Sequence, residues 1–408
     1  MSASIAPLAT TTHELPLPFV VRQPDACREL VPALAHTKAP DVWVWEYTHP
    51  ETGWTLSIAT HAPPGSGKLS LGGFRIAPDD RASVPGYSNA AEAIGLAMGM
   101  EEKIRWSRLI RAGGPLAERN LHRLVGGKCV LLPTADARVG QPRDIELLTF
   151  AVQALNQFEP DSGIHVTTGQ DLGHGILSDG VTPSLAFLHA RFRGSVLADT
   201  SKPTAEGNWR LLRGMLRALG VEAAQARVGL VGVGNIGEHV LHRLRDEGVE
   251  CIAVESDRAK RASLEVRGVQ AWGEESLLDF LAQPMDAVVA NARGGTFSMA
   301  ACDAIARNAR MRVVCGCENL VMPDPRGEEL LRAAGKVYVP TEFGGMMGYL
   351  TAVEEYLAQT EGQEFDVTAL FAAAERLEVA GLEATSRVRA GGYTETFAHA
   401  VEAIHPEH

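Results

Sequence analysis

The chain has 408 residues and a net charge of -12, with 45% apolar and 22% charged residues. Its length favours two domains, because a single hydrophobic core rarely serves more than about 250 to 300 residues. The acidic balance and the lack of a basic run interleaved with aromatic residues exclude nucleic acid as a partner.

The composition predicts neither membrane insertion nor secretion. No run of about 18 apolar residues occurs, and the N-terminal stretch MSASIAPLATTTHELPLPF lacks the basic and apolar regions of a secretory signal. The six cysteines form no CxxC pair, and no cysteine and histidine cluster has the spacing of a zinc site. We therefore expect a cytoplasmic protein with free thiols, no metal site and no membrane contact.

The first half of the chain mixes strand and helix patterns. Residues 42–61 alternate apolar and polar side chains on both sides of HPETG, which predicts a β-hairpin. The stretch LSLGGFRI at 69–76 predicts a strand broken by its glycine pair, and a helix is expected over 89–110. A strand at 128–132 and a helix over 145–158 follow. This order predicts a mixed α/β domain.

The pattern changes near residue 200, where a long amphipathic helix leads into the strand RVGLV. Further strands, DAVVAN, RVVCG and KVYVP, alternate with helical segments, as in a parallel sheet with crossover helices. We predict an α/β protein of two domains. These are a mixed substrate-binding and oligomerisation domain (1–197) and a Rossmann-type NAD domain (198–345), followed by C-terminal helices (346–408) that pack back toward the cleft.

A glycine-rich motif follows the strand at 227–231. The GxGxxG pattern of GLVGVGNIG comprises Gly232, Gly234, Asn235, Ile236 and Gly237. In this pattern the first glycine allows a tight turn, the second admits a pyrophosphate, and the third lets the helix pack on the strand. The next strand ends about 20 residues on in Glu255, where an acid binds the ribose 2′-hydroxyl and repels a 2′-phosphate. The sequence therefore predicts NAD rather than NADP.

The stretch RLVGGKCVLL at 123–132 places Lys128 directly behind two glycines and before apolar residues. A lysine is rarely buried without a partner, because desolvation of its ammonium is costly. The stretch is therefore either a turn with a surface lysine, since glycine pairs mostly mark turns, or a pocket whose lysine takes part in chemistry.

Several short motifs occur in one order: LGGFR, MGMEEK, GGK, QDLG, TAEG, GVGNIG, ENL, and YVP followed by GGMMGYLTAVEE. Over some three-quarters of its length the chain resembles the glutamate, leucine, phenylalanine and valine dehydrogenase superfamily, most closely the leucine and phenylalanine dehydrogenase branch. The resemblance implies NAD-dependent oxidative deamination of an L-amino acid to its 2-oxo acid and ammonia, or the reverse. It also implies a homo-oligomer formed through the first domain.

The resemblance implies a role for each residue that matches a family motif. Lys128 of GGK and Asp171 of QDLG match the catalytic lysine and aspartate. Lys103 of MGMEEK matches the lysine that binds the substrate α-carboxylate. The residues that match the surroundings of the substrate and the nicotinamide are Gly72, Gly73, Thr204 and Asn319.

The chemistry explains these residue types. The substrate amine must be neutral so that the Cα hydride can move to the nicotinamide, after which water adds to the imine and ammonia leaves. A buried lysine beside a second cation can hydrogen bond to the developing oxygen and exchange a proton near neutral pH. A carboxylate near the substrate nitrogen, here Asp171, can carry the other proton, whereas Lys103 must stay charged to pair with the substrate carboxylate.

Two positions indicate the side-chain preference. Glutamate-specific members of the family resemble YKGGLR at the glycine pair and have a serine on the C-terminal helix, whereas this chain has Leu71 and Ala352 there. A buried carboxylate without a donor costs several kcal/mol. We therefore expect an apolar or aromatic substrate side chain rather than glutamate.

The chain also departs from the family pattern. Twenty-four residues separate Lys103 from Lys128, roughly twice the family interval, so Arg105 or Arg111 stays open as the carboxylate anchor. Lys103 follows two glutamates, which is also typical of a solvated helix lysine, and Asp171 could cap a turn.

Three functional interpretations remain open. The first is an NAD-dependent dehydrogenase of an apolar or aromatic L-amino acid. The second is a biosynthetic oxidoreductase on the same scaffold that acts on a modified amino acid or an imine, to which the long insertion points. The third is a non-catalytic NAD-binding regulatory protein, against which Lys128 and Asp171 argue. His174 is left out of the catalytic set, because neutral polar packing accounts for it.

Overall fold

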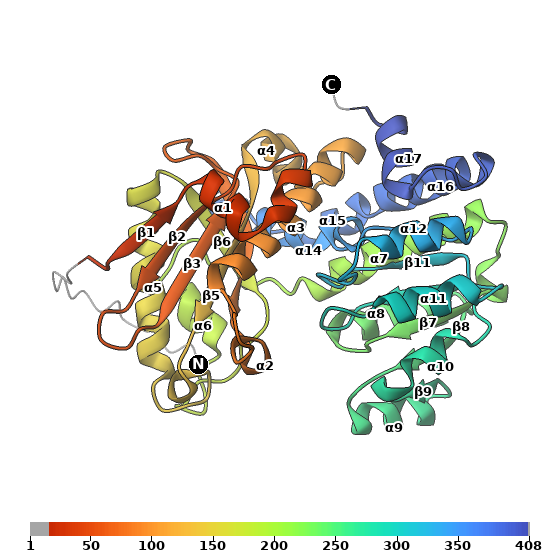
Figure 1. The fold of residues 1–408 in the computed structure, drawn as a ribbon, viewed down its shortest axis with the longest axis horizontal. Helices are drawn as coiled ribbons and strands as arrows, with labels where there is room; N and C mark the ends of the chain where they lie inside the picture. Colours follow the sequence, from red (N-terminus) through yellow and green to blue (C-terminus); the bar gives the residue numbers. More distant parts are fainter. Residues whose placement is uncertain (1–15, 407–408) are drawn as a thin grey trace.

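The computed structural model describes residues 16–406, which form two lobes (Figure 1). Most of the N-terminal stretch considered above as a secretory signal lies outside these residues. Within the described part of the chain, no helix has the length and apolar character needed to span a bilayer. No group of three or more metal-binding side chains occurs between residues 16 and 406.

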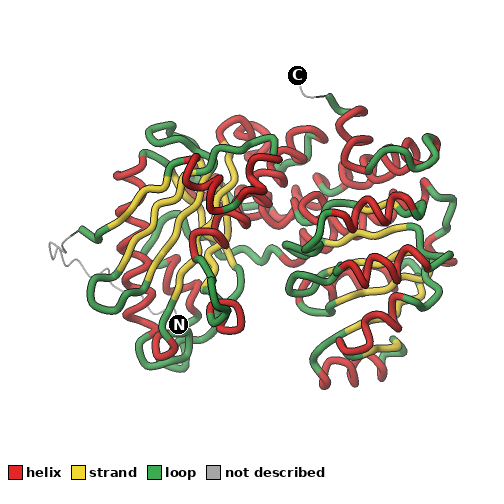
Figure 2. The backbone as a smooth tube through the Cα atoms, in the orientation of Figure 1, coloured by secondary structure: helices red, strands yellow, loops and turns green. Residues whose placement is uncertain are grey.

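The first lobe holds a six-stranded sheet in the order β1-β2-β3-β5-β4-β6. The strands are β1 (Phe19–Arg22), β2 (Trp43–Thr48), β3 (Thr55–Thr60), β4 (Leu69–Ile76), β5 (Leu124–Leu132) and β6 (His165–Gln170). Neighbours from β1 to β5 pair antiparallel, whereas β4 pairs parallel with both β5 and β6. Figure 2 shows these strands as one yellow layer, and the predicted hairpin is confirmed as β2 and β3.

Helices cover both faces of this sheet. Helix α3 (Asn89–Ile110), predicted over the same residues, packs on one face with Ala59 and Val130, and α5 (Asp144–Ser162) packs on the other with Ile58 and Cys129. The alternation follows from the two-residue period of a strand. The remaining helices of the lobe are α1 (Pro24–Leu30), α2 (Asp79–Ala82), α4 (Pro115–Asn120) and α6 (Ser184–His189).

Two glycine pairs lie inside strands, which corrects two predictions. Strand β4 runs unbroken through Gly72 and Gly73, and the Gly-Gly-Lys stretch lies within β5 rather than in a turn. A Cβ on Gly126 would lie 2.3 Å from the backbone N of Glu101 in α3, and a Cβ on Gly72 would lie 2.0 Å from the carbonyl O of Gly127. The glycines therefore serve the close approach of α3 and β4 to β5.

The insertion between the two lysines forms the end of α3, helix α4 and the start of β5. Glu354 of the C-terminal helix α14 (Met346–Glu361) accepts hydrogen bonds from Leu116 N at 3.0 Å and Ala117 N at 2.6 Å, at the start of α4. The Trp106 ring packs edge-on against Phe343, with ring centroids 5.7 Å apart. The insertion therefore joins the first lobe to the C-terminal helices.

The second lobe holds a parallel six-stranded sheet in the order β12-β11-β10-β7-β8-β9. Its strands are β7 (Arg227–Val231), β8 (Glu250–Val254), β9 (Gln270–Trp272), β10 (Ala287–Ala290), β11 (Val313–Gly316) and β12 (Val337–Tyr338). Counted from β7, this is the 3-2-1-4-5-6 order of the doubly wound dinucleotide-binding fold. The α/β fold with a Rossmann-type second domain is therefore confirmed.

The helices of this lobe are α7 (Ser201–Ala218), α8 (Asn235–Asp246), α9 (Arg258–Val266), α10 (Leu277–Leu281), α11 (Met299–Arg307), α12 (Arg326–Ala333) and α13 (Thr341–Gly344). The C-terminal part adds α14, α15 (Val367–Ala373), α16 (Glu375–Ala390) and α17 (Phe397–Ile404). Helix α16 packs along α7, and α14 contacts β6 and α4 of the first lobe as well as α7. Side chains of α14 therefore contribute to the region where the lobes meet.

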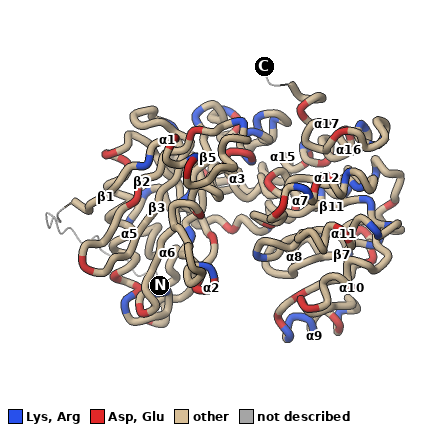
Figure 3. The backbone as a smooth tube through the Cα atoms, viewed as in Figure 1, with Lys and Arg blue, Asp and Glu red and all other residues tan. Residues whose placement is uncertain are grey.

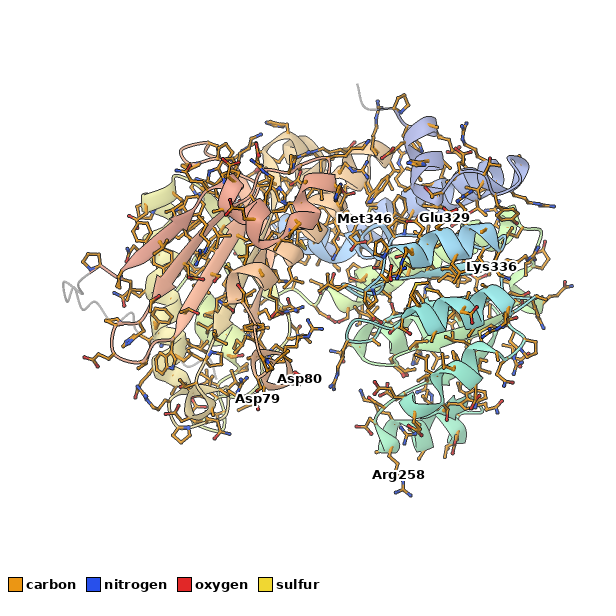
Figure 4. The ribbon with its side chains drawn as sticks, viewed as in Figure 1. Asp79, Asp80, Arg258, Glu329, Lys336 and Met346 are labelled. Carbon is orange, nitrogen blue, oxygen red and sulfur yellow. The ribbon has the colours of Figure 1, made fainter. Side chains whose placement is uncertain are left out.

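Figure 4 shows Met346, the first residue of α14, between the two lobes, and Asp79 and Asp80 of α2 on the side of the first lobe that faces the second. Acidic and basic positions are interspersed over both lobes (Figure 3). All six cysteines are unpaired.

Candidate active site

A cavity of about 240 Å³ lies where the lobes meet. Residues of β4, β5, β6 and α3 line it from the first lobe, and residues after β11 and on α14 line it from the opposite side. Ten of the predicted site residues lie on its walls: Leu71, Gly72, Gly73, Lys103, Lys128, Asp171, Thr204, Ile236, Asn319 and Ala352. The fold therefore brings together side chains that are far apart in the sequence.

Lys128 and Asp171 form an ion pair inside this cavity. Lys128 extends from β5 across Gly73 of β4 to Asp171 at the end of β6, and its side chain is 5% exposed. A Cβ on Gly73 would lie 2.8 Å from Lys128 Nζ and 3.2 Å from the Cβ of Asp171. The second glycine of the pair is therefore what lets the ammonium reach the carboxylate, and the interpretation of Asp171 as a simple turn cap is insufficient.

Arg75 is a site residue that the sequence analysis did not find. Its guanidinium donates to both oxygens of Asp171 at 3.2 Å and to Glu92 of α3 at 2.6 Å, and its side chain is almost completely buried. Burial alone would raise the pKa of Asp171, but the charges of Lys128 and Arg75 outweigh it and hold this pKa below its usual range. Asp171 is therefore held ionised. The signal in the sequence was an arginine inside an otherwise apolar strand.

Lys103 lies in the same cavity, on α3, and is buried. Its Nζ donates to Asn319 Oδ1 at 3.1 Å, which links the two lobes. Burial lowers the pKa of Lys103, Glu342 opposes this shift, and the positive charge of Lys128 adds to it. The solvated-lysine interpretation of Lys103 is wrong, because α3 turns this residue toward the cleft.

The two alternative carboxylate anchors lie elsewhere. Arg105 is hydrogen bonded to Glu102 and Glu402, and Arg111 is exposed at the C-terminal end of α3. Neither arginine lines the cavity, and no residue between 104 and 127 does so. The insertion therefore leaves Lys103 as the cation placed to meet a carboxylate alongside Lys128.

One end of the cavity carries no charged side chain. Its walls are formed by Leu71, Met100, Thr167, Gly169, Tyr349 and Ala352. A Cβ on Gly169 would lie 3.4 Å from a methyl carbon of Val196 and 3.9 Å from the Cβ of Ala352, so the glycine leaves space between β6 and α14. The sequence analysis found Leu71 and Ala352 but missed the other four wall residues, which belong to no motif.

The glycine-rich loop has the geometry needed for a dinucleotide. Gly232 has φ +85° in the turn after β7, and a Cβ on Gly237 would lie 2.2 Å from Gly232 O. A Cβ on Gly234 would meet nothing within 4 Å, and α8 begins at Asn235 without a side-chain cap. Free backbone N–H groups and open space at a helix N-terminus suit a pyrophosphate. A second cavity, of about 540 Å³, includes Gly234 and Asn235.

Glu255 lies directly after β8, as predicted. One of its carboxylate oxygens accepts a hydrogen bond from Val233 N and the other from Asp257 N, both at 2.9 Å. A carboxylate has about four lone-pair positions, so both oxygens can still accept from a ribose hydroxyl. Glu255 therefore also holds the glycine-rich loop against the end of β8.

Thr204 and Cys317 lie on the side of the cavity nearest the second sheet. The Thr204 hydroxyl donates to Thr200 O at 2.6 Å, and Gly348 is close enough that a Cβ there would lie 2.8 Å from this hydroxyl. Cys317 was not predicted. Its thiol lies 3.0 Å from Asn291 Oδ1, and burial raises its pKa to about 12, so it stays neutral.

His174 occupies a structural position. Its Nε2 lies 2.7 Å from Phe74 O and its Nδ1 lies 2.9 Å from Ser184 Oγ. With both ring nitrogens in hydrogen bonds to neutral groups, the imidazole holds the end of β6 and does not line the cavity.

Comparison with protein families gives one match. Residues 185–296 match the model of the NAD binding domain of D-isomer specific 2-hydroxyacid dehydrogenases. The match covers the glycine-rich loop and Glu255, and it agrees with the prediction of NAD as the cofactor. No curated protein matches the sequence.

Solved structures resemble the whole chain in fold. L-tryptophan dehydrogenase from Nostoc punctiforme has a TM-score of 0.61 at 16% identity, covering 92% of this chain and 96% of that one. Leucine-bound hetero-hexameric glutamate dehydrogenase from Thermus thermophilus has a TM-score of 0.61 at 17% identity, covering 86% and 82%. Glutamate dehydrogenase from Peptoniphilus asaccharolyticus has a TM-score of 0.57 at 16% identity, covering 93% and 96%. Both lobes therefore follow one known two-domain fold.

Proposed function

We propose that this protein is an NAD-dependent amino acid dehydrogenase that converts an apolar or aromatic L-amino acid to its 2-oxo acid and ammonia, or runs the reverse reaction. The observation that carries the proposal is the convergence of Lys103, Lys128 and Asp171 in one cavity facing the glycine-rich end of the second sheet. Two ammonium groups and one carboxylate complement the charges of an amino acid's α-carboxylate and amine. The folds named above support the proposal.

In the proposed reaction, Lys103 binds the substrate carboxylate and, with Asn319, fixes its position between the lobes. Asp171, held ionised by Arg75, accepts a proton from the substrate amine so that its nitrogen lone pair becomes available. Lys128 donates a hydrogen bond to the oxygen that forms when water adds to the imine, and it exchanges a proton as ammonia leaves. Bound NAD supplies the acceptor for the Cα hydride, with Thr204 and Ile236 beside it.

We assign the side-chain preference to the uncharged end of the cavity. Leu71 and Ala352 lie there, so a substrate γ-carboxylate would find neither a cation nor a hydroxyl at these two positions. The cost of an unpaired buried carboxylate disfavours glutamate. Glu255 favours NAD over NADP in the proposal, because its carboxylate repels a 2′-phosphate.

The two other interpretations receive less support. The insertion suggested a specialised biosynthetic substrate, but none of its residues lines the cavity, so it gives no reason for an unusual substrate. A purely regulatory NAD-binding protein has no need of a buried ion pair between Lys128 and Asp171, which is costly to desolvate. The leucine and phenylalanine dehydrogenase branch remains the nearest resemblance.

The test is formation of NADH from NAD with a panel of L-amino acids, including glutamate, leucine, phenylalanine and tryptophan. Because the family match concerns 2-hydroxyacid dehydrogenases, D- and L-2-hydroxy acids belong in the same panel. The expected result is activity with apolar or aromatic amino acids and little with glutamate. Activity confined to 2-hydroxy acids, or to glutamate, would contradict the proposal.

A further inference from the structure

Thr167 is a buried polar residue that the reaction proposed above does not use. It lies in β6, is 1% exposed, and lines the uncharged end of the cavity. Its hydroxyl oxygen has no hydrogen-bond partner among the described residues. A buried hydroxyl without a partner costs about 1–3 kcal/mol, so such a group in a substrate cavity calls for an explanation.

The position of Thr167 in the sheet relates it to the reacting groups. Thr167 pairs with Leu71 and Gly169 pairs with Gly73, so all four residues lie in two adjacent rows of β4 and β6. Side chains at alternate positions of a strand share a face, which puts Thr167, Gly169 and Asp171 in one line. At about 3.3 Å per residue, the Thr167 Cα lies about 13 Å from the Asp171 Cα.

Gly169 leaves the middle of this line open. A substrate whose amine meets Asp171 can therefore extend its side chain over Gly169, between Leu71 and Ala352, toward Thr167. A short aliphatic side chain ends near Gly169 and leaves the hydroxyl unpaired. A large aromatic side chain with a polar ring atom reaches the hydroxyl and gives it a partner.

The threonine can adapt to this role. Its Cβ carries both a methyl group and the hydroxyl, and no hydrogen bond fixes which of them faces the cavity. Rotation about χ1 exchanges the two groups without moving the strand. The hydroxyl can thus accept a hydrogen bond from a substrate while its methyl group packs against the wall.

We infer that Thr167 selects an amino acid whose aromatic side chain carries a ring N–H or O–H, as in tryptophan and tyrosine, over phenylalanine and leucine. The inference rests on the proposed dehydrogenase function and narrows its substrate class. Thr167 is a specificity residue, since it contacts the far end of the side chain and not the reacting atoms.

Thr168 provides a matched control. It is the next residue of β6, is also 1% exposed, and its hydroxyl also lacks a partner. Its side chain points to the opposite face of the strand, and it does not line the cavity. Thr167→Val and Thr168→Val therefore remove equivalent buried hydroxyls, one inside the cavity and one outside it.

The experiment measures kcat/KM for tryptophan, tyrosine, phenylalanine and leucine in the full-length protein and its variants. In Thr167→Val, the ratios of tryptophan and of tyrosine to phenylalanine should fall about 3- to 10-fold, the size of one neutral hydrogen bond. In Thr168→Val the ratios should stay within about 2-fold of the parent. Thr167→Ser keeps the hydroxyl and should keep the parent ratios, and Thr167→Ala replaces the valine variant should that one not fold.

The outcomes separate the inference from the proposed function. Oxidation of phenylalanine and leucine with unchanged ratios in Thr167→Val, or an equal change in Thr168→Val, overturns the inference and leaves the dehydrogenase function standing. A parent protein that prefers leucine or phenylalanine to both tryptophan and tyrosine also overturns it. A protein that oxidises no amino acid overturns both.

Discussion

At the scale of single residues, the candidate site concentrates buried charge. Lys103, Lys128, Asp171 and Arg75 lie within one network that alternates positive and negative groups and is closed to solvent. The motifs of the sequence identified the first three, because each occurs in a short pattern with a fixed spacing. Arg75 and Thr167 belong to positions whose importance depends on what lies across the sheet, so the sequence alone did not indicate them.

The burial of Lys103 leads to a prediction about pH. Its pKa lies below the ordinary lysine value of 10.5, because burial and the neighbouring Lys128 outweigh the opposing charges of Glu342, Cys317 and Asp171. Its protonated form binds the carboxylate of a 2-oxo acid, which stays ionised throughout. The KM for the 2-oxo acid in reductive amination should therefore rise with pH as Lys103 loses its proton, at a pH below that of a free lysine.

Lys103→Arg is the control for this prediction. The guanidinium keeps its charge at any accessible pH, although its shape differs from that of an ammonium. The variant should have a higher KM at neutral pH but should lose the rise at alkaline pH. An unchanged rise in the arginine variant, measured at saturating NADH and ammonium, would show that another group is responsible.

At the scale of elements, the two glycine pairs show where local rules fail. Rules for glycine pairs predicted a broken β4 and permitted a turn before Lys128, but both pairs lie within strands. The reason is tertiary, because α3 and β4 approach β5 too closely for a side chain. In contrast, the β2–β3 hairpin and α3 follow from alternation and periodicity within their own residues, and the sequence predicted both.

Gly126→Ala tests this account of β5. The added methyl group would lie 2.3 Å from the backbone N of Glu101, and backbone cannot yield as a flexible side chain does. We expect the free energy of unfolding to fall by about 1–3 kcal/mol or more. In Gly95→Ala, on α3, the added methyl group meets nothing within 4 Å and should stabilise the helix by about 0.5–1 kcal/mol. Chemical denaturation of both variants measures the difference, and equal effects would contradict the packing argument.

At the scale of the whole molecule, the cleft depends on contacts between lobes. Arg81 of α2 donates to the carbonyl O of Arg293 at 3.0 Å, and Lys103 reaches Asn319. The α/β class and the Rossmann order could be predicted from alternating strand and helix patterns. These contacts across the cleft could not, because they depend on how α14 and the insertion hold the lobes together.

Assembly is the second property at this scale. The edge strand β1 exposes Phe19, Val20 and Val21, with Val20 58% exposed, and an apolar edge strand is a site of association. We predict a homo-oligomer formed through this edge. Val20→Glu should lower the molar mass in sedimentation, whereas Val266→Glu, at an equally exposed valine on the second lobe, should not. A parent protein that sediments as a monomer would contradict the prediction.

The measurement that tests the central claim most directly follows a deuterium atom. An L-amino acid deuterated at Cα is incubated with NAD, and the reduced cofactor, the 2-oxo acid and ammonium are quantified together. The account predicts deuterium in the reduced nicotinamide and equal amounts of all three products. It also predicts that Lys128→Ala loses about 10²- to 10⁴-fold in turnover while it still binds NADH. Reduced cofactor without deuterium or without ammonium, or normal turnover in Lys128→Ala, would contradict the account.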